Sequence, residues 1–181
     1  MLDRLHVPIG LGLGLGLGLG SGISGVVAAK KALGVDTEIT GVVSSHANAN
    51  ALSFTPGEPI ATNSADTLAD TLADGLADGL AVRTPSALAL SIIRQHVTRI
   101  VSVDDVKVLA ATSHYFTDTH NVAEGAGAAS LAALMQERAQ SLVGKGQTAG
   151  VVLTGGNIDK KLYRRALLLE AAEQEIAEQE S

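Results

Sequence analysis

With 181 residues, the chain has the size of one domain and is long enough to bury a hydrophobic core. Its 13 basic and 19 acidic residues give a net charge of −6, which argues against nucleic acid as a partner. The absence of cysteine excludes disulfide bonds and thiolate chemistry, and it is compatible with the cytoplasmic location that we expect.

The first part of the chain opens with an uncharged stretch, residues 7–29, that is long enough to span a bilayer. Eight of these residues are glycine, and each costs a helix about 1 kcal/mol relative to alanine, so we expect no membrane span. The elements predicted here are a strand at 5–9, a helix at 23–33 that ends at Gly34, a strand at 38–43 and a short helix at 47–54.

The second part of the chain continues the alternation of strands and helices. Thr84 is predicted to cap a helix with Pro85 at its first position, and Ser102 or Asp104 to cap the next one. The predicted elements are a helix at 86–97, a strand at Arg99–Val103, a helix ending near 116, a short strand at 121–123, a helix at 127–139, a strand at 148–153 and a helix from 159 onward. This order predicts a three-layer, Rossmann-like α/β domain with a mostly parallel sheet.

Two segments are internally repetitive. Leu-Gly recurs along residues 11–20, and near copies of one tetrad fill residues 67–82. Neither has the period of a solenoid, and such stuttered copies are typical of slippage or of an artificially generated sequence. The last residues, 166–181, carry five glutamates, so we expect an acidic helical tail after a globular domain at 1–165.

Glycines before the helix predicted at 23–33 could bind a phosphate group. Their N–H groups lie at a helix N-terminus, where hydrogen bonds and the helix dipole attract anions. The residues concerned are Gly18, Leu19, Gly20, Ser21 and Gly22. With Gly25 they also match a dinucleotide-binding pattern, but Glu38 begins the next strand instead of ending it. A phosphate site, a nucleotide site and a purely structural loop all stay open.

Three more positions could line a ligand cleft. Glu124 and Thr154 each follow a predicted strand, and α/β proteins bind ligands at the carboxyl ends of strands. Gly79 lies in an Ala77-Asp78-Gly79 turn. The five histidines have no metal-ligand spacing, and no Ser-His-Asp arrangement can be defended, so we expect neither a metal site nor a catalytic residue.

Five motifs lie in a characteristic order along the chain. They are Val7-Pro8-Ile9-Gly10, Gly20-Ser21-Gly22-Ile23-Ser24-Gly25, Ala77-Asp78-Gly79, Ala123-Glu124-Gly125-Ala126-Gly127-Ala128 and Thr154-Gly155-Gly156-Asn157. Together they resemble the C-terminal half of the pyridoxal-phosphate-dependent threonine/serine dehydratases, over about residues 3–165. Residues 118–127 are especially similar to the hydroxyectoine-utilization dehydratases. The resemblance implies the large lobe of a fold-type-II pyridoxal-phosphate enzyme.

The resemblance also implies roles for the residues singled out above. The glycine segment from Gly18 to Gly22 would bind the phosphate of pyridoxal 5′-phosphate, and the hydroxyl of Thr154 would bond the pyridine nitrogen. Gly79 and Glu124 would line another edge of the ring. The implied reaction removes water from a β-hydroxy amino acid, a small-molecule partner, and yields a keto acid and ammonia.

The chain departs from the family pattern in three places. No lysine stands in the serine-x-lysine-x-arginine-glycine motif that the family uses to hold the cofactor covalently. The Leu-Gly repeats lengthen the phosphate loop, and Val43 and Ala49 replace carboxylates that bind a cation in some members. We therefore expect this chain to be inactive alone and to form homo-oligomers through exposed apolar surface. The alternative is an α/β scaffold that binds no cofactor.

Overall fold

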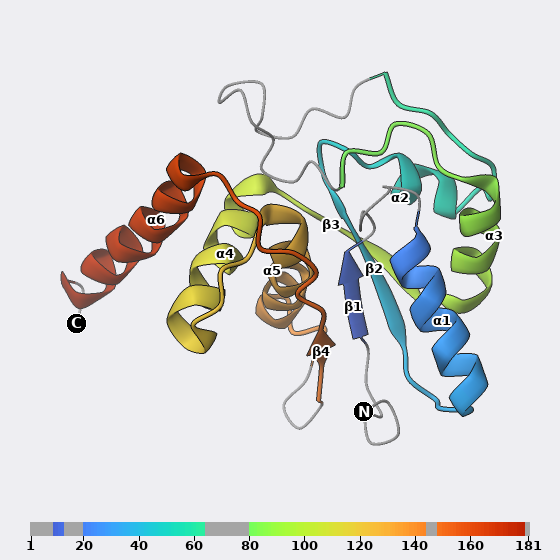
Figure 1. Cartoon of the computed structure of the whole chain (residues 1–181), viewed down its shortest axis with the longest axis horizontal. Coiled ribbons are helices and arrows are strands. Elements are labelled where there is room, and N and C mark those ends of the chain that lie inside the picture. Colours follow the sequence, from blue (N-terminus) through green and yellow to red (C-terminus); the bar gives the residue numbers. More distant parts are fainter. Residues whose placement is uncertain (1–8, 13–19, 64–79, 144–147, 180–181) are drawn as a thin grey trace.

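A computed structural model describes residues 9–12, 20–63, 80–143 and 148–179 of the chain (Figure 1). Its strands form one sheet with the order β3-β2-β1-β4. The strands are β1 (Ile9–Gly12), β2 (Ile39–Ser44), β3 (Arg99–Val103) and β4 (Gly150–Val151). Each neighbouring pair is parallel, with Ile9 opposite both Ile39 and Gly150, and Thr40 opposite Arg99.

The sheet has a topological switch point between β1 and β4, because later strands are added on opposite sides of β1. From β1 the chain passes to β2 and then to β3 on one side, and it later returns to place β4 on the other side of β1. In parallel α/β sheets, the carboxyl ends of the two strands at such a switch point form the crevice in which ligands bind. The segments that follow β1 and β4 are therefore the candidate ligand-binding segments of this fold.

Helices cover both faces of the sheet, which makes three layers (Figure 1). On one face lie α1 (Ser21–Leu33), α2 (Ala49–Phe54) and α3 (Ala87–His96). On the other lie α4 (Asp105–Thr119) and α5 (Gly125–Ala139), with α6 (Lys160–Gln179) packed outside α4. The predicted three-layer α/β fold with a parallel sheet is confirmed.

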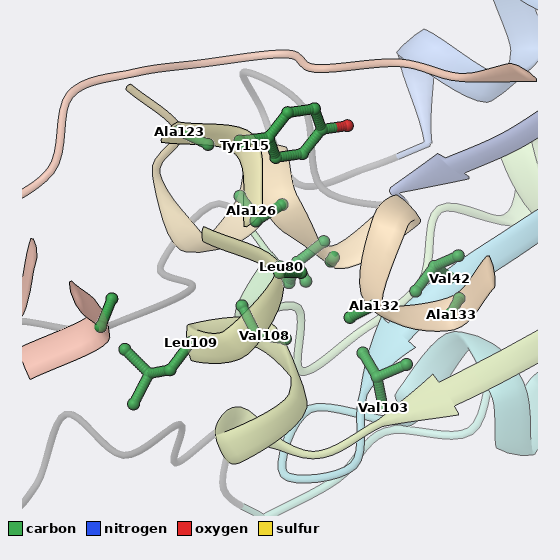
Figure 2. Packing of buried hydrophobic residues seen from close by; sticks show 14 of the residues in the cluster. Val42, Leu80, Val103, Val108, Leu109, Tyr115, Ala123, Ala126, Ala132 and Ala133 are labelled. Carbon is green, nitrogen blue, oxygen red and sulfur yellow. The ribbon is translucent and has the colours of Figure 1, made fainter. Parts of the chain in front are cut away.

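Strand β2 supplies side chains to the hydrophobic cores on both faces because successive residues of a strand point to opposite sides. Ile39 and Val43 pack in the core beside α1 and α3, whereas Val42 packs in the core beside α4 and α5. Figure 2 shows Val42 near Ala132 and Ala133 of α5. The buried face of α5 is rich in alanine, so this helix approaches the sheet closely without large side chains.

Several predicted boundaries are confirmed. Helix α1 ends at Gly34, whose φ of 63° is the left-handed conformation typical of a glycine C-cap. Helix α4 is capped by Asp104, whose Oδ1 accepts a hydrogen bond from the Lys107 amide at 2.9 Å. Strand β3 has the predicted bounds, Arg99–Val103.

Four local predictions were wrong. The cap of α3 is Ser86, whose Oγ accepts from the Ala89 amide at 3.5 Å, and not Thr84. Residues 121–123 form no strand, and β4 contains two residues instead of six. Strand β1 continues to Gly12, past Ile9 where the predicted strand at 5–9 was to end, and residues 5–8 lie outside the described part.

The C-terminal helix crosses the predicted domain boundary at 165/166. Leu162 and Ala166, on either side of this boundary, are buried against the core of α4 and α5. The division into a domain at 1–165 and a tail at 166–181 stays a prediction. Within the described ranges, we find no helix with the length and apolar character that crossing a membrane requires.

Candidate functional site

The N-terminus of α1 lies beyond the carboxyl end of β1, on one side of the switch point. Its N-cap, Gly20, has φ 83° and ψ 15°, and as a glycine it brings no side chain that could accept from the first-turn amides. A Cβ at Gly20 would lie 3.1 Å from the Cβ of Ala89, so glycine suits both the backbone conformation and the space. Ser21, the first helical residue, is exposed. The N–H groups of this first turn are suited to binding an anion.

The other side of the switch point is the segment Thr154-Gly155-Gly156-Asn157, here called the 154–157 loop, which follows β4. This loop lies against the start of α5. The carbonyl of Gly155 accepts a hydrogen bond from the Glu124 amide at 3.0 Å, and Oε2 of Glu124 accepts one from the Asn157 amide at 3.1 Å. Two hydrogen bonds therefore join the loop to Glu124, the N-cap residue of α5.

Three glycines allow this close approach. A Cβ on Gly127 would lie 2.6 Å from the carbonyl oxygen of Gly155, and one on Gly156 would lie 2.7 Å from the carbonyl oxygen of Val122. A Cβ on Gly155 would overlap the carboxylate of Glu124. Because real Cβ atoms do not approach backbone oxygens so closely, any larger residue would push the loop away from α5.

The hydroxyl of Thr154 lacks a partner among the described residues. Its Oγ1 is buried and has no hydrogen-bond partner within the part of the chain that the structure describes. Leaving a buried polar atom unpaired costs about 1–3 kcal/mol, and because Thr154 follows β4 at the switch point, its hydroxyl is a candidate contact for a ligand. A hydroxyl can donate a hydrogen bond to an aromatic ring nitrogen, which is the contact that the resemblance implies.

The sequence-predicted site residues fall into three groups. Gly20, Ser21 and Gly22 lie at the N-terminus of α1, whereas Glu124 and Thr154 lie together where α5 meets the 154–157 loop. The remaining predicted positions, Gly18, Leu19 and Gly79, lie outside the described residues.

The sequence did not predict which residues hold the 154–157 loop against α5. The prediction assigned a role in the last motif to Thr154 alone, whereas Asn157 and Gly155 are the residues bonded to Glu124. The adjacent pair of glycines could have indicated a close backbone approach.

The positions predicted to have lost a cation site carry no metal ligands. Val43 is a buried residue of β2, and Ala49 is the buried first residue of α2. Among the residues that the structure describes, no group of three or more histidine, aspartate or glutamate side chains could hold a metal ion. His114 forms a surface pair with Asp118, with 3.4 Å between Nδ1 and Oδ2.

A small cavity lies at the opposite end of the sheet. It measures about 20 Å³, which is room for about one water molecule, and Thr40, Ser130 and Glu137 are among the residues that line it. Thr40 is near the start of β2, so this cavity lies away from the strand ends at which the switch point lies. It is too small for a cofactor.

Comparison with known proteins identifies the family. The family model described as "Pyridoxal-phosphate dependent enzyme" matches residues 13–155. The L-threonine ammonia-lyase of Thermotoga maritima is 29% identical over 145 residues, which cover 80% of this chain and 33% of the relative. The catabolic L-threonine dehydratase of Escherichia coli K12 is 31% identical over 158 residues, which cover 87% of this chain and 43% of the relative.

The fold agrees with these matches. The processed form of threonine deaminase isoform 2 from Solanum lycopersicum superimposes with a TM-score of 0.74 at 24% identity, over 92% of this chain and 45% of that chain. The chain thus spans less than half the length of these relatives. Because the family model covers most of its residues, the chain belongs to the pyridoxal-phosphate-dependent enzymes.

Proposed function

We propose that this chain is the cofactor-binding lobe of a dehydratase that removes water from a β-hydroxy amino acid. The observation that carries the proposal is the buried hydroxyl of Thr154, unpaired within the described residues and placed after β4 at the switch point. A ring nitrogen supplied by a ligand would satisfy it. The relatives are named as threonine ammonia-lyases and dehydratases, which supports this reaction class.

The residues of this chain would hold the cofactor at two points. The N–H groups of Ser21 and Gly22, together with the preceding Gly18, Leu19 and Gly20, would bind its phosphate. When bound, pyridoxal phosphate supplies an electron sink for the bond broken at the α-carbon of the substrate. Gly79 would lie at another edge of the ring.

Thr154 would set the electronic state of the ring. A neutral hydroxyl donates a hydrogen bond to the pyridine nitrogen but brings no negative charge that would favour protonation of this nitrogen. The side chain would therefore favour β-elimination, which yields a keto acid and ammonia. The fold alone does not determine this chemistry, so the proposal depends on the site.

Removal of the proton from the substrate α-carbon would require the lysine of the family motif, and none of the lysines in this chain stands in that motif. Its lysines are Lys30, Lys31, Lys107, Lys145, Lys160 and Lys161. Lys30 and Lys31 lie in the last turn of α1, at the end opposite Gly20, and Lys107 is paired with Asp104. We infer that turnover requires a polypeptide that carries the missing lysine.

The experiment that tests the proposal is a pyridoxal-phosphate titration followed by circular dichroism in the absorption band of the cofactor. We expect a saturable induced signal, because an achiral ligand gains optical activity only in an ordered chiral site. Thr154→Val, which keeps the shape of the side chain, should weaken binding about tenfold, whereas Thr154→Ser should keep most of the affinity.

Two results would contradict the proposal. A folded protein with no induced signal would favour the alternative of an α/β scaffold without a cofactor. Tighter binding of NAD or AMP than of pyridoxal phosphate would favour a nucleotide site at Gly20 and Gly22 instead. If the cofactor binds, adding a polypeptide with the lysine motif and measuring deamination of threonine tests the reaction itself.

A further inference from the structure

We propose that Glu124 is a positioning residue whose carboxylate fixes the 154–157 loop, and with it the hydroxyl of Thr154. The link between Glu124 and the loop is a property of the protein without any ligand. Only its consequence for cofactor binding depends on the function proposed above.

The position of Glu124 at the start of α5 leaves its side chain free for this role. An N-cap side chain commonly accepts a hydrogen bond from an amide in the first turn of its own helix. Glu124 is the N-cap of α5 but forms no such bond. Its Oε2 instead accepts from the amide of Asn157, which is distant in sequence.

The loop is fitted to this carboxylate. Gly155 lies so close to the side chain of Glu124 that a Cβ would overlap both Oε1 and Cδ. The main chain adds a second link, because the Glu124 amide donates to the Gly155 carbonyl at 3.0 Å. Glu124 thus contacts the loop on both sides of Gly156, and the residue before Gly155 is Thr154.

Two substitutions of Glu124 distinguish positioning of the loop from direct contact with the cofactor. If Glu124 acts by accepting the Asn157 N–H bond, glutamine can replace it, because the amide oxygen of glutamine is also an acceptor. Methionine has a similar length but only a weak acceptor, and it should release the loop. If the charge of Glu124 acted directly on the cofactor, glutamine would be as harmful as methionine.

The test measures amide hydrogen exchange by NMR without cofactor in the parent protein, Glu124→Met and Glu124→Gln. We expect the Asn157 amide to exchange at least about fivefold faster in Glu124→Met and within about twofold of the parent rate in Glu124→Gln. The amide of Leu109, a fully buried residue of α4, serves as the reference for global stability. Thr154→Val, which leaves Glu124 and Asn157 intact, should not change the Asn157 rate.

Three results would overturn the proposal. An unchanged Asn157 rate in Glu124→Met would show that the carboxylate does not hold the loop. Equal acceleration in both variants would show that acceptance of the N–H bond is not what matters. Equal acceleration at Asn157 and Leu109 would mean that the substitution acts through global stability.

A parallel titration with pyridoxal phosphate measures the consequence for binding. We expect Glu124→Met to bind at least about fivefold more weakly than the parent protein, and Glu124→Gln to bind nearly as well. If the parent protein binds no cofactor, the proposed function fails, while the exchange rates still decide the role of Glu124. If the parent protein binds and glutamine weakens binding as much as methionine, the positioning role fails alone.

Discussion

Gly127 of α5 and Gly155 of the 154–157 loop meet backbone to backbone. A Cβ added to Gly127 would lie 2.6 Å from the carbonyl oxygen of Gly155 and 3.0 Å from Cδ1 of Leu153. We expect Gly127→Ala to lower the free energy of unfolding by about 1–3 kcal/mol, because neither backbone can move without losing hydrogen bonds. Urea unfolding followed by circular dichroism measures the change.

Gly25 supplies the matched control for this prediction. It also lies in a helix, but a Cβ there would meet nothing within 4 Å. Gly25→Ala should therefore raise the free energy of unfolding by about 0.5–1 kcal/mol, the usual gain of alanine over glycine in a helix. The same effect from both alanines would contradict the account of Gly127.

Arg99 and Glu137 form a two-pronged ion pair between β3 and α5, with N–O distances of 2.6 and 2.8 Å. The Glu137 side chain is only 7% exposed, and its hydrogen bond raises the pKa of Arg99, so the guanidinium stays charged. Arg99→Met should lower the free energy of unfolding by about 3 kcal/mol, because it leaves a buried carboxylate unpaired. The double variant Arg99→Met/Glu137→Leu should lose clearly less, and an equal loss in urea unfolding would refute this explanation.

Asp104 caps α4 and should contribute stability that depends on pH. Burial, the largest single influence, raises the pKa of Asp104, but hydrogen bonds from Lys107 together lower this pKa below its usual value of 3.8. A lowered pKa in the folded state means that the contribution is complete above the unfolded pKa and is lost as the pH falls through the folded one.

Two substitutions of Asp104 distinguish the stability contributed by the helix cap from that contributed by the negative charge. Asp104→Ala should lower the free energy of unfolding at pH 7 by about 1 kcal/mol, because the N-cap acceptor is lost. Asp104→Asn keeps an acceptor but does not titrate, so the parent protein should lose stability relative to this variant only below about pH 4. Unfolding in urea at pH 7, 5 and 3 gives both numbers, and a constant difference across this range would rule out the charge effect.

Large apolar side chains on several elements predict self-association. Leu33 of α1, Leu88 of α3 and Val106 of α4 have exposed fractions of 54%, 73% and 60%. In the relatives, which are more than twice as long, further chain is present that could cover such surface. We expect light scattering to show dimers or larger species at high concentration, and Leu88→Glu to reduce them if α3 is in the interface. A monomer at all concentrations would contradict this prediction.

Elements with local signals could be predicted from the sequence. Gly34 ends α1 because a left-handed residue is needed there, and Asp104 begins α4 because its side chain caps the helix. The cap of α3 was assigned wrongly because Thr84 and Ser86 both flank Pro85. The rule that proline occupies the first helical position favours Thr84 as the cap. In the structure, the Ala89 amide donates its hydrogen bond to the side chain of Ser86 instead.

The site was predictable only in part because its contacts are made between distant segments. Val122 and Val152 lie in apolar runs that are typical of strands, yet neither belongs to a strand. A backbone hydrogen bond from the Glu124 amide to the Gly155 carbonyl joins the segments that follow these two valines. The motif could place Thr154 at a strand end, but the contact of Glu124 with Asn157 depends on how β4 and α5 pack.

The pairing of β1 with β4 has a consequence for biosynthesis. Ile9 lies opposite Gly150, so the two strands that flank the switch point come from nearly opposite ends of the chain. During synthesis, helices α1 to α5 can leave the ribosome before β4 exists, because chains emerge from the N-terminus onward. Contacts between residues so far apart in sequence form slowly, since a long loop must close first. The candidate site should therefore be the last part of the sheet to form, because the carboxyl ends of β1 and β4 come together only after α5 has been made.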